Sequence, residues 1–211
     1  NVDNIISGYG LLGGGTLSLT NDAAGTIEAI TATLLVDTGA TVVTNAGLME
    51  AIANGTLELR GIIDSHAGGR LVASGASGGT STLLLDAATL LGGTISTTTG
   101  DLNSTLRVTT SGTLDGTAHA VTLTAGSHAV IDGNEALTLM GSLVNAGTVA
   151  VGGDGIYGYA ATLLVGGAVS LSGGGTIALT EHANGQANIA TQLITGGALE
   201  NVDNTIIGYG E

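Results

Sequence analysis

The sequence predicts an all-β chain: a right-handed parallel β-helix, or β-solenoid, of about ten coils of about 20 residues, with uncapped ends. Two internal repeats lead to this prediction. The decapeptide NVDNIISGYG at 1–10 returns as NVDNTIIGYG at 201–210, with eight identities. The stretch GGGTLSLTNDAAG at 13–25 returns as GGGTIALTEHANG at 173–185, also with eight. Both offsets between the copies are multiples of the same number, which indicates a coil of about 20 residues.

A short motif marks the individual coils. A glycine, usually followed by a small residue and an aliphatic one, recurs at intervals of roughly 20 residues. The glycines of this series are Gly25, Gly47, Gly69, Gly93 and Gly112. Between them, aliphatic residues alternate with polar ones, as at Leu17 and Leu19, which places the aliphatic side chains on one face of a strand. Glycine, Asn-Gly and Asp-Gly accept the positive φ that tight corners require.

Stacking of such coils accounts for the composition. Each short strand is expected to pair in parallel with its equivalent in the next coil, about 4.8 Å away, so ten coils form a rod of about 48 Å. The chain has no Phe and no Trp, which suits an interior of thin aliphatic layers. Asn and Thr at equivalent positions are expected to form hydrogen-bonded ladders. An antiparallel sandwich is the alternative, but it does not explain the regular spacing.

The repeats also predict the domain organisation. We expect residues 1–211 to form a single β-solenoid segment, one unit of a repeat of roughly 200 residues, with 1–10 and 201–210 at the same coil position. The chain has no proline and no lysine, the residues that commonly protect an open sheet edge. The prediction is therefore self-association end to end through open terminal coils, in a longer array or between copies.

The charge balance narrows the range of possible binding partners. Seventeen acidic residues face only three basic ones (Arg60, Arg70 and Arg107), for a net charge of −14. This balance disfavours nucleic acid and anionic lipid as partners, and no apolar run is long enough for a membrane helix. The absence of cysteine excludes disulfides and thiolate metal sites. We expect any export signal to lie outside this segment.

No constellation of residues predicts catalysis. Asp64, His66 and Arg70 share the loop DSHAGGR and form the best local cluster, but the preferred interpretation is a solvated loop with ordinary charges. Four histidines are scattered without a recognisable metal-ligand spacing: His66, His119, His128 and His182. The prediction is that the chain is not an enzyme and has no catalytic, cofactor-binding or metal-binding residues.

Other motifs are compared with known binding functions. The turn GGDGIYGYA at 152–160 is similar to a calcium-binding turn, but such turns act in tandem and this one occurs once, so calcium stays only an alternative. Its tyrosines, Tyr157 and Tyr159, could stack on sugar rings, although a loop position explains them as well. Thr-x-Thr candidates for ice binding at 31–33, 97–99 and 122–124 do not recur in every coil. The glycine-rich 8–15 precedes no predicted helix, so a nucleotide site is rejected.

Four stretches carry a resemblance to a known group of proteins. They are NVDNTIIGYG, GGGTLSLTNDAAGTIEA, LLVDTGATVVTNAGLMEA and LSGGGTIALTEHANGQANI, within residues 1–60 and 166–211. They resemble repeats of large secreted bacterial β-solenoid surface proteins of the haemagglutinin, autotransporter-passenger and giant adhesin type. The resemblance implies an extracellular location at the bacterial cell surface and a structural role, as a rigid rod or filament for adhesion or matrix. It assigns no site residues. The alternative is a carbohydrate-binding or carbohydrate-cleaving parallel β-helix, with surface polysaccharide as partner.

Overall fold

The computed structural model describes residues 1–75, 79–97, 104–152, 160–180 and 193–208. Within these residues there is no helix, and 18 strands form one continuous sheet in which the paired strands run parallel. The strands are β1 (Ile5–Gly13), β2 (Thr20–Asn21), β3 (Thr26–Asp37), β4 (Val43–Asn45), β5 (Leu48–Ile52), β6 (Thr56–Asp64), β7 (Arg70–Ser74), β8 (Thr82–Leu91), β9 (Gly93–Ser96), β10 (Thr105–Val108), β11 (Ser111–Leu123), β12 (His128–Ile131), β13 (Ala136–Asn145), β14 (Thr148–Val151), β15 (Thr162–Ser172), β16 (Thr176–Leu179), β17 (Leu193–Asn201) and β18 (Thr205–Gly208). The predicted parallel β-solenoid is confirmed, and the right-handed sense of its winding stays a prediction.

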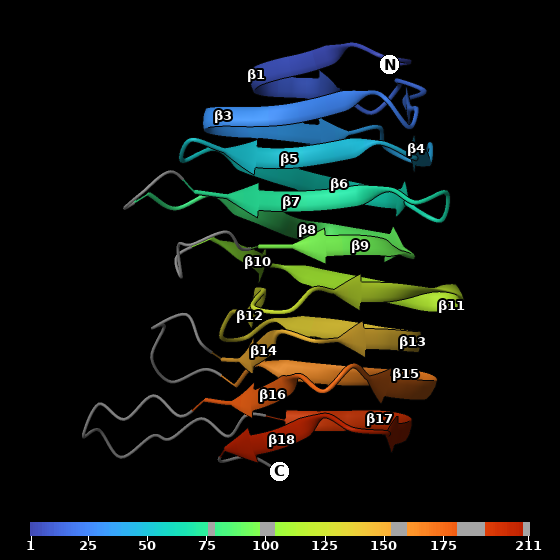
Figure 1. Cartoon of the computed structure of the whole chain (residues 1–211), viewed down its shortest axis with the longest axis vertical. Helices are drawn as coiled ribbons and strands as arrows, with labels where there is room; N and C mark the ends of the chain where they lie inside the picture. Colours follow the sequence, from blue (N-terminus) through green and yellow to red (C-terminus); the bar gives the residue numbers. More distant parts are fainter. Residues whose placement is uncertain (76–78, 98–103, 153–159, 181–192, 209–211) are drawn as a thin grey trace.

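Each winding has three sides, and the windings stack along the long axis of the molecule (Figure 1). The first side contains residues 5–8 of β1, 26–30 of β3, all of β5, β7 and β9, and the ends of β11, β13, β15 and β17. The second side contains residues 10–13 of β1, 33–37 of β3, the starts of β6 and β8, and β10, β12, β14, β16 and β18. The third side contains β2, β4, the ends of β6 and β8, and the starts of β11, β13, β15 and β17.

The predicted number of coils, ten, is too high. On the second side one ladder runs through nine strands, from the first winding to the last, in eight steps. Its members are Leu12, Val36, Leu59, Leu85, Val108, Ile131, Val151, Leu179 and Gly208. The length of a winding is uneven: Val43 pairs with Ile63, whereas Thr162 pairs with the much more distant Leu193. Corners of unequal length therefore reduce the number of windings that the chain can make.

The core is a stack of aliphatic layers. Alternate residues of each strand point inward, so β6 buries Leu57 and Leu59 while Thr56 and Glu58 stay half-buried on the outside. The neighbouring inward residues in the windings above and below continue each column of the core. Glycine at the corners allows this close stacking. A Cβ on Gly47 would lie 2.3 Å from the carbonyl oxygen of Asp22 and 2.4 Å from that of Gly25.

The two copies of the decapeptide do not lie on the same side. Residues 5–8 pair with 26–29 on the first side, whereas Thr205–Gly208 pairs with Thr176–Leu179 on the second. In both copies the fourth residue nevertheless directly precedes a strand. Asn4 precedes a strand as Gly25 does below it, and Asn204 precedes β18 as Gly175 precedes β16. The two copies therefore lie at different corners and on different sides of the winding, the first before the first side and the second before the second side.

Candidate functional site

A buried asparagine ladder follows the corner between the third and first sides. Asn1 donates from Nδ2 to Oδ1 of Asn21 at 2.7 Å, and Asn21 donates in the same way to Asn45 at 2.9 Å. Asn45 then donates to Oγ of Ser65 at 3.3 Å. Asn21, Asn45 and Ser65 are fully buried. The predicted amide ladder is confirmed, and it satisfies polar groups that would otherwise be costly to bury beside an aliphatic core.

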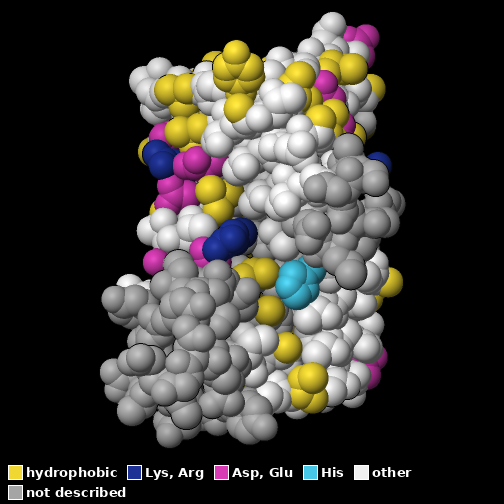
Figure 2. All heavy atoms as spheres, turned by 90° about the vertical axis from the view of Figure 1, so that its left-hand side faces the viewer, with side chains coloured by type: hydrophobic (Ala, Val, Ile, Leu, Met, Phe, Trp, Pro, Cys, Tyr) yellow, Lys and Arg dark blue, Asp and Glu magenta, His cyan; other side chains and the backbone are white. Residues whose placement is uncertain are grey.

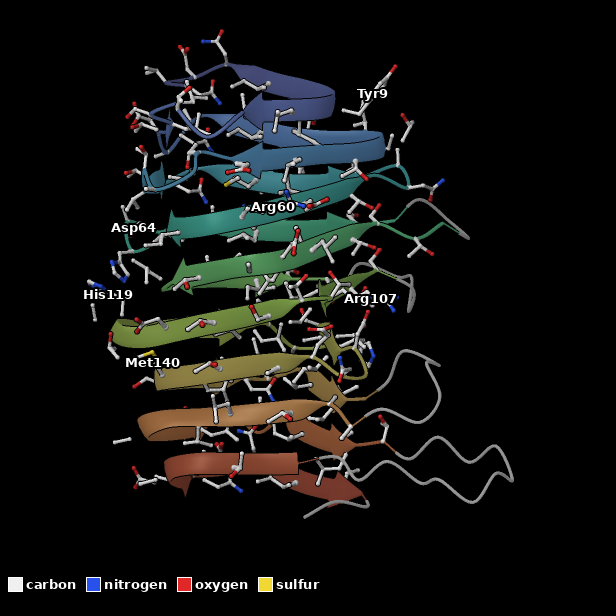
Figure 3. All side chains as sticks on the ribbon, turned by 180° about the vertical axis from the view of Figure 1, so that it is seen from behind. Tyr9, Arg60, Asp64, Arg107, His119 and Met140 are labelled. Carbon is white, nitrogen blue, oxygen red and sulfur yellow. The ribbon has the colours of Figure 1, made fainter. Side chains whose placement is uncertain are left out.

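The first and last windings expose apolar side chains. Ten large hydrophobic residues are exposed in the part of the chain that the structure describes, and seven of them belong to these two windings. The seven are Val2, Ile5, Tyr9, Leu11, Val202, Ile206 and Ile207. Tyr9 is 72% exposed and projects from the N-terminal end of the rod (Figure 3). Figure 2 shows hydrophobic side chains gathered at this same end, over the first windings.

Both terminal windings also carry an open strand edge among the described residues. Residues 5–8 pair only with the winding below them, and β18 pairs only with β16 above it. Ile206 shows the effect on side chains: its partner Ile177 is fully buried, whereas Ile206 is 38% exposed because no further winding lies over it. An open, apolar strand edge is a surface to which another strand can add.

Along the rod, acidic and basic side chains alternate at one corner. Asp37, Arg60 and Asp86 lie on successive windings, and Arg60 reaches both Asp86, at 2.6 Å, and Glu58, at 2.8 Å. The hydrogen bond from Thr110 is the main reason why the pKa of Asp86 is lowered, and Arg60 adds to the effect despite opposing desolvation. Further down, Arg107 donates from Nε to both carboxylate oxygens of Asp132, at 2.8 and 2.9 Å. These pairs offset part of the large negative charge.

Two acidic side chains on the first side lie next to each other with less compensating positive charge nearby. Glu28 and Glu50 are in-register neighbours on β3 and β5. Partial burial raises the pKa of Glu50, the charge of Glu28 raises it further, and Arg70 acts in the opposite direction. Like charges directly opposite each other destabilise a sheet.

The predicted loop cluster is only partly assembled. His66 Nδ1 lies 3.1 Å from Asp64 Oδ1, and the backbone N–H of His66 donates to the same oxygen at 3.0 Å. Arg70 instead begins β7, where it acts on Glu50. A residue that the sequence did not connect joins the cluster: the ring of His119 lies 4.8 Å from that of His66, and Figure 3 shows Asp64 and His119 along one edge of the rod. Within the described residues, no group of three or more His, Cys, Asp or Glu side chains is placed to hold a metal ion.

His128 lines a hollow of about 540 Å³ at the corner between the first and second sides. Thr97, Ser127, Thr148 and Thr176 are among its other walls, together with several glycines. Burial lowers the pKa of His128, which favours the neutral imidazole. The described lining contains no carboxylate, so it lacks the paired acids of a glycoside-cleaving site.

The structure also contains a column of threonines at equivalent positions, whose members the sequence alone did not identify. The first residue of eight consecutive strands on the second side is threonine in seven cases and His128 in one. The threonines are Thr33, Thr56, Thr82, Thr105, Thr148, Thr176 and Thr205. The outward residue two positions on varies from Leu35 to Glu58, Leu84 and Arg107, so no Thr-x-Thr row forms on this side. The column was hidden by its irregular sequence spacing.

Most of the other sequence candidates lie outside the described residues. His182, Tyr157, Tyr159 and most of the calcium-like turn lie outside the described residues, as do two positions of the 97–99 motif. Residues 8–15 form the second part of β1 and the turn after it.

Comparison with known proteins gives no relative: no protein-family model, no curated protein and no solved structure matches the chain. In the part of the chain that the structure describes, no helix has the length and apolar character needed to cross a membrane.

Proposed function

We propose that this chain is a structural repeat of a large extracellular bacterial protein, in which it forms a rigid rod that extends end to end as a filament for surface adhesion or matrix. The observation that carries the proposal is the pair of open terminal windings. Seven of the ten exposed large hydrophobic side chains among the described residues gather there, next to unpaired strand edges. The extracellular bacterial setting rests on the sequence resemblance.

The mechanism is mechanical. Parallel ladders run through all windings on every side, so a load along the rod is shared by many backbone hydrogen bonds. The aliphatic columns and the asparagine ladder lock the register of each winding on the next. Such a rod needs no cofactor and no catalytic residue, and we propose that the chain is not an enzyme.

The experiment follows the association of the purified chain with concentration, by light scattering and negative-stain electron microscopy. We expect oligomers that grow in one dimension. A matched pair of variants tests the ends: Ile206→Lys in the last winding and Ile62→Lys in mid-rod, since both side chains are 38% exposed in the structure. Ile206→Lys should abolish growth and Ile62→Lys should leave it unchanged. Growth that is unaffected by Ile206→Lys contradicts the proposal.

Carbohydrate binding is the second candidate function, favoured by the hollow beside His128, which threonine and serine side chains line together with glycines. Hydroxyl groups and neutral imidazole suit the hydrogen bonding of sugars. In that case the chain should bind a soluble polysaccharide, and replacing Thr148 and Thr176 by Val should weaken binding without affecting association. Association without any polysaccharide binding favours the rod alone.

A further inference from the structure

We propose that the winding of the rod continues into a second copy of this sequence, whose residues 5–8 pair with residues 193–196 of the first copy on its third side. The inference rests on the proposed function, and it specifies how the two copies are rotated at the joint. A three-sided rod offers three such rotations, and the order of the sides along the chain distinguishes between them.

The described chain begins and ends on different sides of the rod. Along the sequence the sides follow in the order first, second, third. Residues 5–8 open this order on the first side, and residues 205–208 end it on the second. The next strand of the winding would lie on the third side, where residues 193–196 pair only with β15 among the described residues. β1 and β17 lie at opposite ends of the rod (Figure 1), so a second copy can supply this strand.

In this register every side of the rod continues across the joint. Each of three ladders joins part of the first winding of the second copy to part of the last winding of the first copy: 5–8 to 193–196, 10–13 to 198–201, and 17–21 to 205–208. Asn1 already lies over Asn21, since the backbone N–H of Asp22 donates to the carbonyl oxygen of Asn1. In the joint, Asn1 of the second copy takes the place beyond Gly208.

The other two registers leave gaps in the stack. Without rotation, residues 5–8 would lie on 198–201, and two sides would pair. On the third side, however, a full winding would be missing between 193–196 and 20–21. With the opposite rotation, residues 5–8 would lie on 205–208, and only that side would pair. Backbone groups that are enclosed without partners are costly, so the register without gaps is favoured.

The lengths of the corners agree with this register. In the second copy, Tyr9 alone separates the paired residues of the two parts of β1. In the last winding of the first copy, Gly197 alone separates those of β17, so the joint places one short corner on another. A shift of one residue here brings the inward positions into phase, as β17 already does against β15 at the same corner. Without rotation, Tyr9 would lie over the longer corner 202–204.

The hydrophobic core is open at both ends of the rod, and the joint closes it. Five hydrophobic side chains of the described structure are only partly buried against the core: Ile6, Leu12, Leu17, Leu179 and Leu199. All but one lie in the first or last winding, and Leu179 pairs with Gly208. In the joint, Leu17 of the second copy comes over Ile206, which is 38% exposed although its partner Ile177 is fully buried. Covering Ile206 removes apolar surface from water and favours association.

The pairing on the third side brings two specific residues together. Gly8 and Gly196 each pair with a buried residue of the neighbouring winding, so both are inward positions. With Gly8 of the second copy on Gly196, Ser7 lies beside Thr195, and both residues are exposed in the single chain. Their Cα atoms would be about 4.8 Å apart, which is within the range of a disulfide. The chain contains no cysteine, so any disulfide reports only introduced residues.

The experiment compares three double variants that share one cysteine: S7C/T195C, S7C/E200C and S7C/I207C. Glu200 and Ile207 are exposed and hold the outward positions that Ser7 would meet without rotation and with the opposite rotation. After mild oxidation, we expect a ladder of disulfide-linked oligomers from S7C/T195C on non-reducing gels, reversed by reductant, and none from the other two. The single variants S7C and T195C should give no ladder.

The possible failures of this joint and of the proposed function are distinguishable. A ladder from S7C/E200C or S7C/I207C overturns the proposed register and leaves end-to-end association intact. The absence of links in all three variants overturns it as well when the unmodified chain associates in light scattering. If the unmodified chain remains a monomer at every concentration, end-to-end association itself fails, and this joint fails with it.

Discussion

The side chain of Asn145 donates from Nδ2 to Oδ1 of Asn204 at 2.8 Å, although the two residues are 59 positions apart in the sequence. The winding between them contributes Gly175 at the same corner, and the backbone N–H of Gly175 donates to the carbonyl oxygen of Asn145. A Cβ on Gly175 would lie 2.8 Å from Nδ2 of Asn145 and 2.5 Å from two carbonyl oxygens. The absence of a side chain at Gly175 therefore lets the amides meet past the intervening winding.

We predict that Gly175→Ala destabilises the fold by about 3 kcal/mol, because the groups around the added methyl are mainly rigid backbone. Gly174→Ala is the matched control. Gly174 has a φ of +74° with open space around its Cβ position, so it should cost only the strain of that conformation, about 1 kcal/mol. Urea unfolding measures both. Equal losses in the two variants would show that the crowding at Gly175 has no energetic consequence.

The asparagine ladder gives a second prediction. Asn45 is fully buried, accepts from Asn21 and donates to Ser65, so Asn45→Ala leaves two buried partners incomplete. We expect a loss of about 2 kcal/mol in the free energy of unfolding. Asn4→Ala should change it by less than about 0.5 kcal/mol, because the exposed Asn4 side chain contacts only Asp3 in the described structure. A neutral result for Asn45→Ala would contradict a stabilising ladder.

The stacked pair Glu28 and Glu50 predicts a pH effect. Because the folded-state pKa of Glu50 is raised, its ionisation opposes folding: the cost is absent below the ordinary value of 4.5 and grows as pH rises through the folded-state pKa. Solvent screens part of the repulsion, so Glu50→Gln should raise stability at neutral pH by only about 0.5 kcal/mol. Stability below pH 4.5 should stay unchanged. Thermal unfolding across this pH range measures the effect.

Glu58→Gln is the control for this prediction. Glu58 also lies on the outside of the sheet, but its carboxylate contacts Arg60 at 2.8 Å. The substitution should bring no gain at neutral pH. If Glu50→Gln and Glu58→Gln behave alike at neutral pH, the repulsion between Glu28 and Glu50 is not the cause.

The acidic residues at the two ends of the rod lead us to predict that end-to-end association depends on ionic strength. Asp3 in the first winding and Asp203 in the last are both exposed acids, and end-to-end association brings these two ends of the rod together. Their repulsion is screened as salt rises from about 0.01 M to about 1 M, so association should strengthen over this range. Asp203→Asn should strengthen association at low salt and reduce its dependence on salt, as seen by light scattering. The mid-rod control Asp64→Asn should leave that dependence unchanged.

Much of the fold was predictable because it follows from sequence features that are visible within short stretches of the chain. The stacked glycines Gly25, Gly47 and Gly69, the period-two alternation and the lack of large aromatic residues all describe a thin parallel stack. The pairing of Leu48 with both Thr26 and Arg70 confirms the expected spacing there. The number of windings was not predictable, since insertions at corners carry the chain well beyond a regular coil before it returns to pair, as between Thr162 and Leu193. A fixed sequence period cannot predict where these insertions occur or how long they are.

The candidate site was less visible in the sequence, since its members meet only through the winding. The shift of the decapeptide from the first side to the second depends on the summed lengths of all the corners between. The contact between His66 and His119, and the threonine column through Thr56 and Thr82, likewise join residues at irregular separations. What the sequence could show was the duplication itself, which led to the expectation of open, self-complementary ends.

Electron cryo-microscopy of the assembled material tests the central claim most directly. We predict fibres in which parallel strands continue across each joint at about 4.8 Å, with a rise of about 40 Å for each copy, because each copy contributes between eight and nine windings. Dispersed monomers under all conditions, or fibres whose copies meet through anything other than a continued parallel ladder, would contradict the account.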